Sequence, residues 1–225
     1  MSVENEADQL SNANARVPAW GALAYPDFRL FWAHGVLQGI SRHMREMLTF
    51  FLVWDLSGSA VQLGVTGLFQ AVPIILFGLL GGALADSINR KKMLLATQGA
   101  NLVSAGLLTA LVFTDVVAVW HLWLLSSFWS AVNSLNRPSQ RAYMPKLVPP
   151  SHIVNAVTWY GSLSQGTLFI GPIIAGFLVA WVGIGWAFLA NVIVLGLAWF
   201  ATVAIRASGA PEGSSRRASI RTVWE

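Results

Sequence analysis

The chain is poor in charged residues and has no cysteine. Only 11% of its 225 residues are Asp, Glu, Lys or Arg, whereas an average soluble domain has about 25%. Because 55% of the residues are hydrophobic, so few charges cannot cover the apolar surface of a soluble fold. This composition excludes an ordinary cytosolic domain, a disordered chain and a nucleic-acid-binding module. The absence of cysteine excludes a disulfide scaffold, a thiolate zinc site and a cysteine nucleophile.

The sequence motifs of common enzyme classes are also missing. The four histidines, at positions 34, 43, 121 and 152, do not have the spacing of zinc ligands. The absence of a P-loop argues against ATP-driven transport by this chain alone. The absence of a Gly-x-Ser-x-Gly elbow argues against a membrane hydrolase. We therefore expect no catalytic residues, no metal site, no cofactor and no enzyme activity.

Six apolar stretches dominate the sequence instead. They cover approximately residues 30–54, 63–85, 93–113, 119–137, 153–182 and 184–205. A membrane crossing takes about 20 apolar residues. Within the hydrocarbon layer the backbone must satisfy its own hydrogen bonds, which favours helices. The sequence therefore predicts an all-α membrane protein with six transmembrane helices.

The basic residues indicate how these helices are oriented. Twelve of the 14 Lys and Arg residues precede the first stretch, follow the sixth, or lie in the second–third and fourth–fifth connections. The other three connections contain no Lys or Arg, and the remaining two arginines lie inside the first stretch. By the positive-inside rule, both termini are cytoplasmic. We expect residues 1–27 to be a cytoplasmic tail, 28–206 the six-span domain, and 207–225 a cytoplasmic tail or the start of a longer loop.

The connection after the second stretch contains a short pattern of glycine, acid and base. Gly82 lies four residues before Asp86, and a basic triplet follows, made of Arg90, Lys91 and Lys92. Asp86 lies within reach of the triplet or of a helix N-terminus, and Asn89 tolerates the left-handed conformation of a tight turn. From these residues alone, a basic topology anchor beside a capping Asp and a functional loop are equally good interpretations.

This pattern resembles the cytoplasmic loop signature of the major facilitator superfamily, Gly-x-x-x-Asp-(Arg/Lys)-x-Gly-x-(Arg/Lys)-(Arg/Lys). The matching residues are Gly82, Asp86, Lys91 and Lys92, whereas Ser87 replaces a basic residue and Asn89 replaces a glycine. In that family the loop gates the movement of two halves and does not bind substrate. The resemblance implies the same gating role for the loop from Gly82 to Lys92, including Arg90.

Glycine and proline recur in the fifth stretch, at Gly161, Gly166, Gly171, Pro172 and Gly176. Steps of five residues rotate by about 140° on a helix, so the glycines do not form one dimerisation stripe. Pro172 removes a backbone hydrogen bond and favours a kink. A glycine-rich packing helix is one interpretation. The other is a resemblance to the Gly-Pro signature of superfamily exporters, carried by Gly171, Pro172 and Gly176. Segments 80–99 and 137–156 are similar to the enterobactin exporter, or transmembrane secretion effector, group of bacterial proteins.

The first stretch carries a polar stripe. On a helix, Gln38, Arg42, Arg45, Glu46 and Thr49 project within an arc of about 100°, with His43 to one side. Three charges at the bilayer centre cost about 8–10 kcal/mol, more than the apolar residues of the stretch return. The stripe therefore cannot face lipid, and we expect it to face a water-filled cavity or charged partners.

Two interpretations of this stripe remain open. Arg42 and Glu46 are spaced to pair at i, i+4. The positive charge of Arg45 then has no counter-ion within the stripe, which is net positive. In the functional interpretation Gln38, Arg42, Arg45 and Glu46 line a translocation path. Arg45 attracts an anionic or catechol-like group there, and Glu46 exchanges a proton. In the structural one they form an ion pair near one membrane face.

The resemblance implies one six-helix half of a major facilitator fold in the bacterial inner (plasma) membrane. Its activity would be secondary-active, proton-coupled export of a small amphiphilic molecule, of siderophore or drug type, by alternating access. The partners would be the lipid bilayer, the substrate and the proton. Because the superfamily has two six-span halves, we also consider a truncated or split half without autonomous transport, acting only as a membrane interaction partner. A missing C-terminal half or a second copy would complete it.

Overall fold

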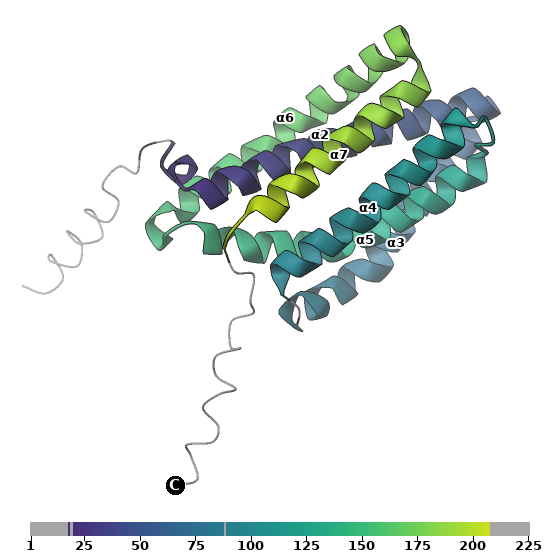
Figure 1. Cartoon of the computed structure of the whole chain (residues 1–225). Coiled ribbons are helices and arrows are strands. Elements are labelled where there is room, and N and C mark those ends of the chain that lie inside the picture. Colours follow the sequence, from purple (N-terminus) through teal and green to yellow (C-terminus); the bar gives the residue numbers. More distant parts are fainter. Residues whose placement is uncertain (1–17, 19, 88, 208–225) are drawn as a thin grey trace, which may run out of the picture.

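The computed structural model describes residues 18, 20–87 and 89–207, without the side chains of 79–87, 137–139, 141, 142, 163 and 164. Within these residues the regular structure is helical (Figure 1). The long helices are α2 (Pro26–Ser57), α3 (Ala60–Ser87), α4 (Arg90–Phe113), α5 (Val119–Tyr143), α6 (Ile153–Val182) and α7 (Ile184–Ala204). The short 3-10 helices are η1 (Gly21–Ala24), η2 (Met144–Leu147) and η3 (Pro150–His152).

The local sequence sets several helix ends. α2 starts at Pro26, a residue whose fixed φ suits the first helical position. It stops at Gly58, whose left-handed φ of 57° is typical of a glycine that ends a helix. α4 starts after Asn89, whose side chain accepts hydrogen bonds from the backbone N–H groups of Lys91 and Lys92. With φ −59°, Asn89 caps this helix and does not form the left-handed turn expected from the sequence.

Four helical segments of the described chain are long and apolar enough to cross a membrane. They are Ala60–Gly78, Arg90–Phe113, Pro150–Val182 and Ile184–Ala204. α2 and α5 are of similar length, but their apolar sequence is interrupted by polar side chains that line an internal cavity. Large apolar side chains such as Val61, Val103, Val154 and Trp181 are strongly exposed. These features make the chain an all-helical membrane protein.

The helices pack in two groups that share a boundary. α2 lies against α6 and α7, α3 lies against α5, and α4 contacts both α5 and α7 (Figure 1). α2 and α6 approach closely where each has a glycine. A Cβ atom at Gly39 would lie 2.6 Å from Oγ1 of Thr167, and one at Gly171 would lie 2.9 Å from the carbonyl oxygen of Ile40. Side chains larger than hydrogen would therefore force these two helices apart.

Buried apolar side chains form two clusters, one toward each end of the helix bundle. The first cluster joins the starts of α2, α4 and α6 to the ends of α5 and α7. It contains Ala22, Phe28, Phe31, Leu94, Tyr143, Met144, Leu147, Val148, Ala156 and Ile205. The second joins the opposite ends of the same helices. It contains Met44, Leu48, Leu52, Val53, Leu108, Val112, Leu122, Ala175, Ala187 and Phe188.

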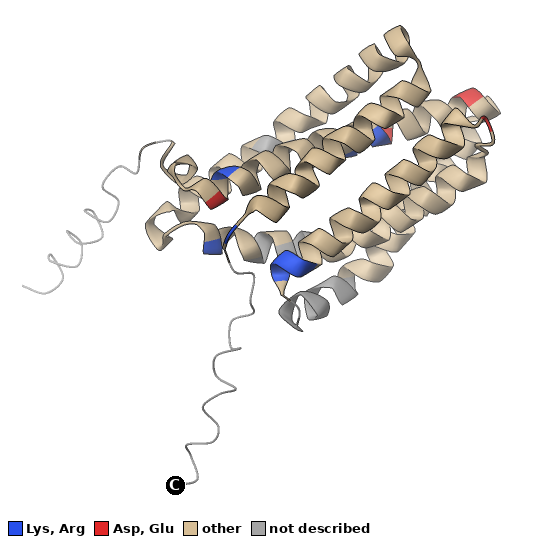
Figure 2. Cartoon of the chain, viewed as in Figure 1, with Lys and Arg blue, Asp and Glu red and all other residues tan. Residues whose placement is uncertain are grey.

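Basic residues gather at the end of the bundle where the described chain begins and finishes (Figure 2). The start of α2 and the residues after α7 are tied together there, because the backbone N–H of Arg206 donates to Oδ1 of Asp27 over 3.0 Å. Asp55 lies in the last turn of α2, and Asp115 lies in the connection between α4 and α5. Both acidic residues therefore belong to the opposite end of the bundle. The charge pattern of the sequence thus corresponds to two ends of one structure.

Candidate functional site

A polar cavity of about 280 Å³ lies inside the bundle, between the two apolar clusters. α2 and α5 supply most of its wall. The residues that line it are Gly35, Gln38, Gly39, Ser41, Arg42, His43, Asn101, Trp129, Asn133, Asn136, Gln140, Tyr160, Thr167 and Leu195. On each helix these residues fall between the positions that belong to the first and second clusters. The cavity is therefore a polar layer enclosed by apolar packing on either side.

One side of the cavity is crossed by a chain of hydrogen bonds from three helices. Nε2 of Gln140 donates to Oε1 of Gln38 over 2.6 Å. The hydroxyl of Tyr160 donates to Oε1 of Gln140 over 3.1 Å. The chain therefore joins α5 to both α2 and α6 at the level of the cavity.

Two asparagines on the cavity wall have unsatisfied polar atoms. Asn101 and Asn136 are each only 1% exposed. In the described part of the chain, Oδ1 of Asn101 and both amide atoms of Asn136 have no hydrogen-bond partner. A buried polar group without a partner costs about 1–3 kcal/mol, so these amides are poised to bind a ligand or water.

The two arginines of α2 converge on one aromatic ring of α5. The guanidinium carbon of Arg42 lies 5.8 Å from the ring centroid of Trp129, and that of Arg45 lies 5.3 Å from it. Arg42 lines the cavity. Arg45 is 5% exposed and lies behind the ring, where Nη2 donates to Oγ of Ser104 over 3.3 Å and to the carbonyl oxygen of Leu125 over 3.2 Å. Such cation–π contacts fix both cations beside the cavity.

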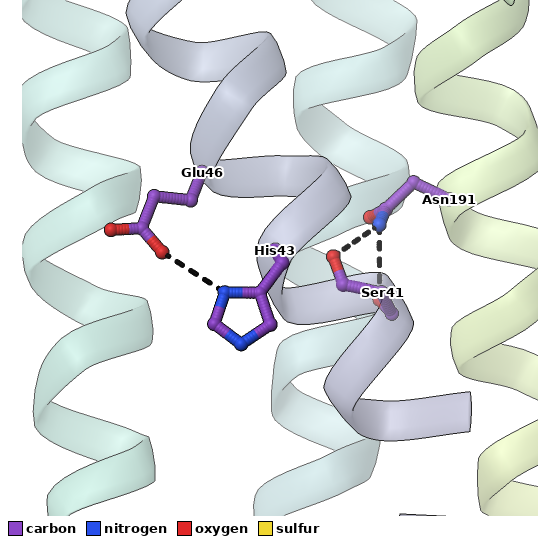
Figure 3. A network of polar contacts seen from close by, with 4 residues as sticks. All are labelled: Ser41, His43, Glu46 and Asn191. Carbon is purple, nitrogen blue, oxygen red and sulfur yellow. Dashed lines mark hydrogen bonds and ion pairs between the residues drawn. The ribbon is translucent and has the colours of Figure 1, made fainter. Parts of the chain in front are cut away.

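Glu46 is placed differently from its neighbours in the predicted stripe. Its side chain is 45% exposed, and Oε2 lies 3.6 Å from Nδ1 of His43, a contact that becomes an ion pair when the imidazole is protonated (Figure 3). Glu46 does not belong to the cavity lining, whereas His43 does. Of the four residues predicted for a translocation path, the structure brings Gln38 and Arg42 to the cavity. It places Arg45 behind Trp129 and Glu46 on the surface beside His43.

α2 is also anchored by hydrogen bonds to α7, beside the cavity. Nδ2 of Asn191 donates to the carbonyl oxygen of Ser41 over 2.6 Å and to its Oγ over 3.0 Å (Figure 3). Two turns away on each helix, Nδ1 of the buried His34 contacts the carbonyl oxygen of Ala198 at 3.3 Å. These contacts fix the position of α2 against α7 at the level of the cavity.

The loop predicted to act as a gate is partly outside the described side chains. Gly82 and Asp86 fall in the last turns of α3, where the structure describes the backbone but not the side chains. Arg90 is the first residue of α4, and Lys92 is exposed. Nζ of Lys91 donates to the carbonyl oxygens of Ile205 and, over 3.2 Å, Val203. The Lys91 cation therefore caps the C-terminal end of α7, where a positive charge is favourable.

Tyr143 adds a second tie at the same end of the bundle. Its hydroxyl donates to the carbonyl oxygen of Ala207 over 2.7 Å. Burial, together with the negative charge of Asp27, raises the pKa of Tyr143 to about 12. The hydroxyl thus remains protonated and keeps its role as a donor.

The glycine and proline residues of α6 have different surroundings. Gly171 is buried against α2, and its Cβ position would lie 2.7 Å from Cβ of His43. Gly166 has open space where a Cβ would be, and Gly176 approaches only Cε of Met47, at 3.8 Å. Pro172 lies inside α6, which continues from Ile153 to Val182. Of these residues, Gly171 is the one that determines how closely the helices pack beside the cavity.

Sequence reasoning missed most of the cavity wall, although one signal was present. Trp129, Asn133, Asn136 and Gln140 follow one another at intervals of four, three and four residues. This spacing places them on one face of a helix, and all four line the cavity. Asn101, Tyr160 and Thr167 lie on α4 and α6, and no pattern in the sequence connects them to these four residues.

Comparison with known proteins places the chain in a family. The sequence profile described as transmembrane secretion effector matches residues 17–218. Macrolide efflux protein A of Streptococcus pyogenes is 27% identical over 154 residues, which are 67% of this chain and 37% of that protein. The Staphyloferrin A transporter of Staphylococcus aureus is 23% identical over 168 residues, 73% of this chain and 42% of that protein.

A further relative is the uncharacterized MFS-type transporter YfiS of Bacillus subtilis, which is 27% identical over 138 residues. These are 61% of this chain and 32% of that protein. The chain therefore spans less than half the length of the curated relatives that it matches.

Proposed function

Because the chain belongs to the transmembrane secretion effector family of the major facilitator superfamily, we propose that its polar cavity is part of the path of a secondary-active exporter. The family and the names of the relatives make it a multi-pass membrane transporter and not an enzyme. The substrate in this proposal is a small amphiphilic molecule of the siderophore or drug type, and transport proceeds by alternating access. The membrane is the bacterial inner membrane, and all six long helices cross it with both termini in the cytoplasm.

The observation that carries this proposal is the polar cavity between the two apolar clusters of the bundle. Ionisable side chains within a membrane span are costly and usually face a water-filled pathway. Arg42 and His43 lie on the cavity wall, and so do Asn101 and Asn136, which have buried amide atoms without a partner among the described residues. A bundle built only for stability would place apolar side chains at these positions.

Proton coupling is assigned to the pair formed by His43 and Glu46. Glu46 is exposed enough to exchange a proton with water, and the 3.6 Å ion pair joins it to a residue on the cavity wall. A change in the protonation of Glu46 would therefore alter the charge beside the cavity. The gating role stays with the loop from Gly82 to Lys92, whose Lys91 holds the end of α7.

A complete path requires a second set of helices in this proposal. The relatives are more than twice as long as the part that the chain matches, and superfamily transporters rock two halves around a central site. Further residues or a second copy of the chain would supply the missing half. Because the chain contains no cysteine, a single Glu46→Cys substitution gives a unique probe. Disulfide-linked dimers in native membranes would indicate a second copy at this face of α2.

Efflux from cells tests the function. Bacteria that express the full chain are loaded with a labelled macrolide or labelled staphyloferrin A, and retention is compared with that of cells carrying an empty vector. We expect faster efflux of at least one compound. Arg45→Ala and Arg42→Gln should abolish the difference without reducing the amount of protein in the membrane, while Arg206→Gln, at an exposed position outside the cavity, should retain it. Equal efflux in all strains would rule out autonomous transport by this chain.

A further inference from the structure

The buried Arg45 has no acidic partner in the described part of the chain. Its polar contacts there are the hydroxyl of Ser104 and the carbonyl oxygen of Leu125, and its Nη1 atom is buried without a partner. A buried charge that is not compensated is strongly unfavourable and is retained when it has a role in binding. The sequence of α2 thus maintains a costly cation directly behind the wall of the cavity.

The acids of the described chain cannot balance this cation. Asp27 and Asp55 lie near the two ends of α2, and Asp115 lies in the connection between α4 and α5. Glu46 is at the correct depth, but its side chain is 45% exposed and pairs with His43. Among the described side chains, none that lines the cavity is a carboxylate. The region around Trp129 is therefore net positive, with Arg42 and Arg45 both close to its ring.

The amide of Asn136 adds a requirement for hydrogen bonding. Both its nitrogen and its oxygen are buried without partners, so the site offers one donor and one acceptor whichever way the amide is oriented. A ligand that satisfies both must carry an acceptor and also a hydroxyl or N–H group. The volume of about 280 Å³ lies just below the usual range for ligand pockets, about 300–1,000 Å³, which suits a polar head group and a short stem.

From these observations we infer that the cavity selects amphiphiles that carry an oxyanion, a carboxylate or a phosphate, next to a hydrogen-bond donor. The inference rests on the proposed function, because it names the substrate class of the same cavity. Arg42 contacts the oxyanion from the cavity wall, since a guanidinium matches the geometry of carboxylate and phosphate oxygens. Arg45 strengthens the positive field from behind Trp129. Asn136 binds the neighbouring donor and acceptor groups.

Three probes of similar shape but different charge test this inference. The full chain is purified in a non-ionic detergent, and the affinities for 1-naphthoate, 1-naphthamide and 1-naphthylmethylammonium are measured by the ligand-induced rise in Tm and by equilibrium binding. We expect 1-naphthoate to bind about tenfold more tightly than 1-naphthamide, and 1-naphthylmethylammonium to bind most weakly. Naphthyl phosphate should bind as well as 1-naphthoate or better.

Substitutions show whether the preference arises in the cavity. Arg42→Gln and Arg45→Gln should each reduce the preference for 1-naphthoate by about tenfold, and Arg206→Gln should not change it. Asn136→Asp breaks no hydrogen bond seen in the structure and introduces a negative charge. This variant should bind 1-naphthoate more weakly and 1-naphthylmethylammonium more tightly than the unmodified chain does. It serves as the second test if Arg45→Gln fails to fold.

Several results would overturn the inference. Equal affinity for 1-naphthoate and 1-naphthamide would do so, and so would a preference that survives in both arginine variants. Stabilisation by dihexanoyl phosphatidylglycerol without binding of 1-naphthoate would indicate a lipid head group in place of a soluble amphiphile. Binding is measured without transport, so charge-selective binding without efflux would count against the proposed function alone. Efflux without charge-selective binding would count against this inference alone.

Discussion

Gln140 on α5 and Gln38 on α2 are joined by a hydrogen bond of 2.6 Å between their amide groups. These helices belong to different packing groups, because α2 lies mainly against α6 and α7, whereas α5 lies mainly against α3 and α4. The bond therefore crosses the boundary between the groups at the level of the cavity. It adds to the contacts between α2 and α5, while the two groups are joined mainly where α4 meets α7.

The Gln38–Gln140 bond should appear as a coupling energy. Gln38→Ala and Gln140→Ala are compared singly and together by reversible unfolding in mixed micelles. We expect the double variant to be less destabilised than the sum of the single variants by about 0.5–1.5 kcal/mol, the range for hydrogen bonds between membrane helices. Tyr160→Phe removes the bond to Oε1 of Gln140 and leaves the Gln38–Gln140 pair in place, so it is the control. Strict additivity would contradict a direct bond.

Gly171→Ala should destabilise the protein by about 1–3 kcal/mol. The added methyl group would lie 2.7 Å from Cβ of His43 and 2.9 Å from the carbonyl oxygen of Ile40, and the backbone of α2 cannot yield as a flexible side chain could. Gly166→Ala on the same helix has open space and should leave Tm unchanged or raise it. Unfolding of both variants in detergent measures the difference, and equal stability would refute the close crossing of α2 and α6.

Lys91→Met should lower the stability by about 1 kcal/mol, typical of a charge-assisted contact at a helix end. The substitution keeps an apolar stem but removes the cation that binds the carbonyl oxygens of Val203 and Ile205. Lys92→Met changes the adjacent, exposed residue and should have little effect. Thermal unfolding of the two variants compares them directly. A larger loss in Lys92→Met would mean that Lys91 is not the capping residue.

The stability of the protein should fall between pH 10 and pH 12 because of Tyr143. The ordinary pKa of tyrosine is about 10, and burial raises the pKa of Tyr143 to about 12 in the folded chain. Below pH 10 the phenol is neutral in both states and stability does not depend on it. Above pH 10 the unfolded state ionises first, which favours unfolding. Tyr143→Phe should lose less Tm between pH 9 and pH 11.5, and parallel losses would contradict the shifted pKa.

The helices were easier to predict than the site. The apolar stretch 153–182 coincides with α6, and 184–205 differs from α7 by one residue, because Gly183 interrupts the sequence between them. The first predicted stretch begins at residue 30, four residues after the start of α2. The reason is that Pro26 and the residues that follow it are a mixture of polar and apolar types. Hydrophobic runs and glycine or proline boundaries are local, so a single sequence contains them.

The cavity depends on contacts between distant residues, which a single sequence does not contain. The angular grouping on α2 identified Gln38 and Arg42, both on the cavity wall. The same grouping included Glu46, which lies eight positions after Gln38. Two residues so far apart can project on the same side of a helix and still face different neighbouring helices. The pairing of Glu46 with His43 could not be distinguished from a pairing with Arg42 by spacing alone, since i, i+3 and i, i+4 neighbours are both within reach.

The glycine contact between α2 and α6 also limits how the two helices can move. Gly39 faces Thr167, and Gly171 faces the backbone near Ile40 and His43. Sliding one helix along the other would bring a side chain into a space that only hydrogen fills, whereas a change in crossing angle would preserve the contact. The two helices can therefore pivot like scissor blades around this point. Such a pivot changes the separation of the helix ends at both faces of the membrane together, while the distance between the two helices beside the cavity stays constant.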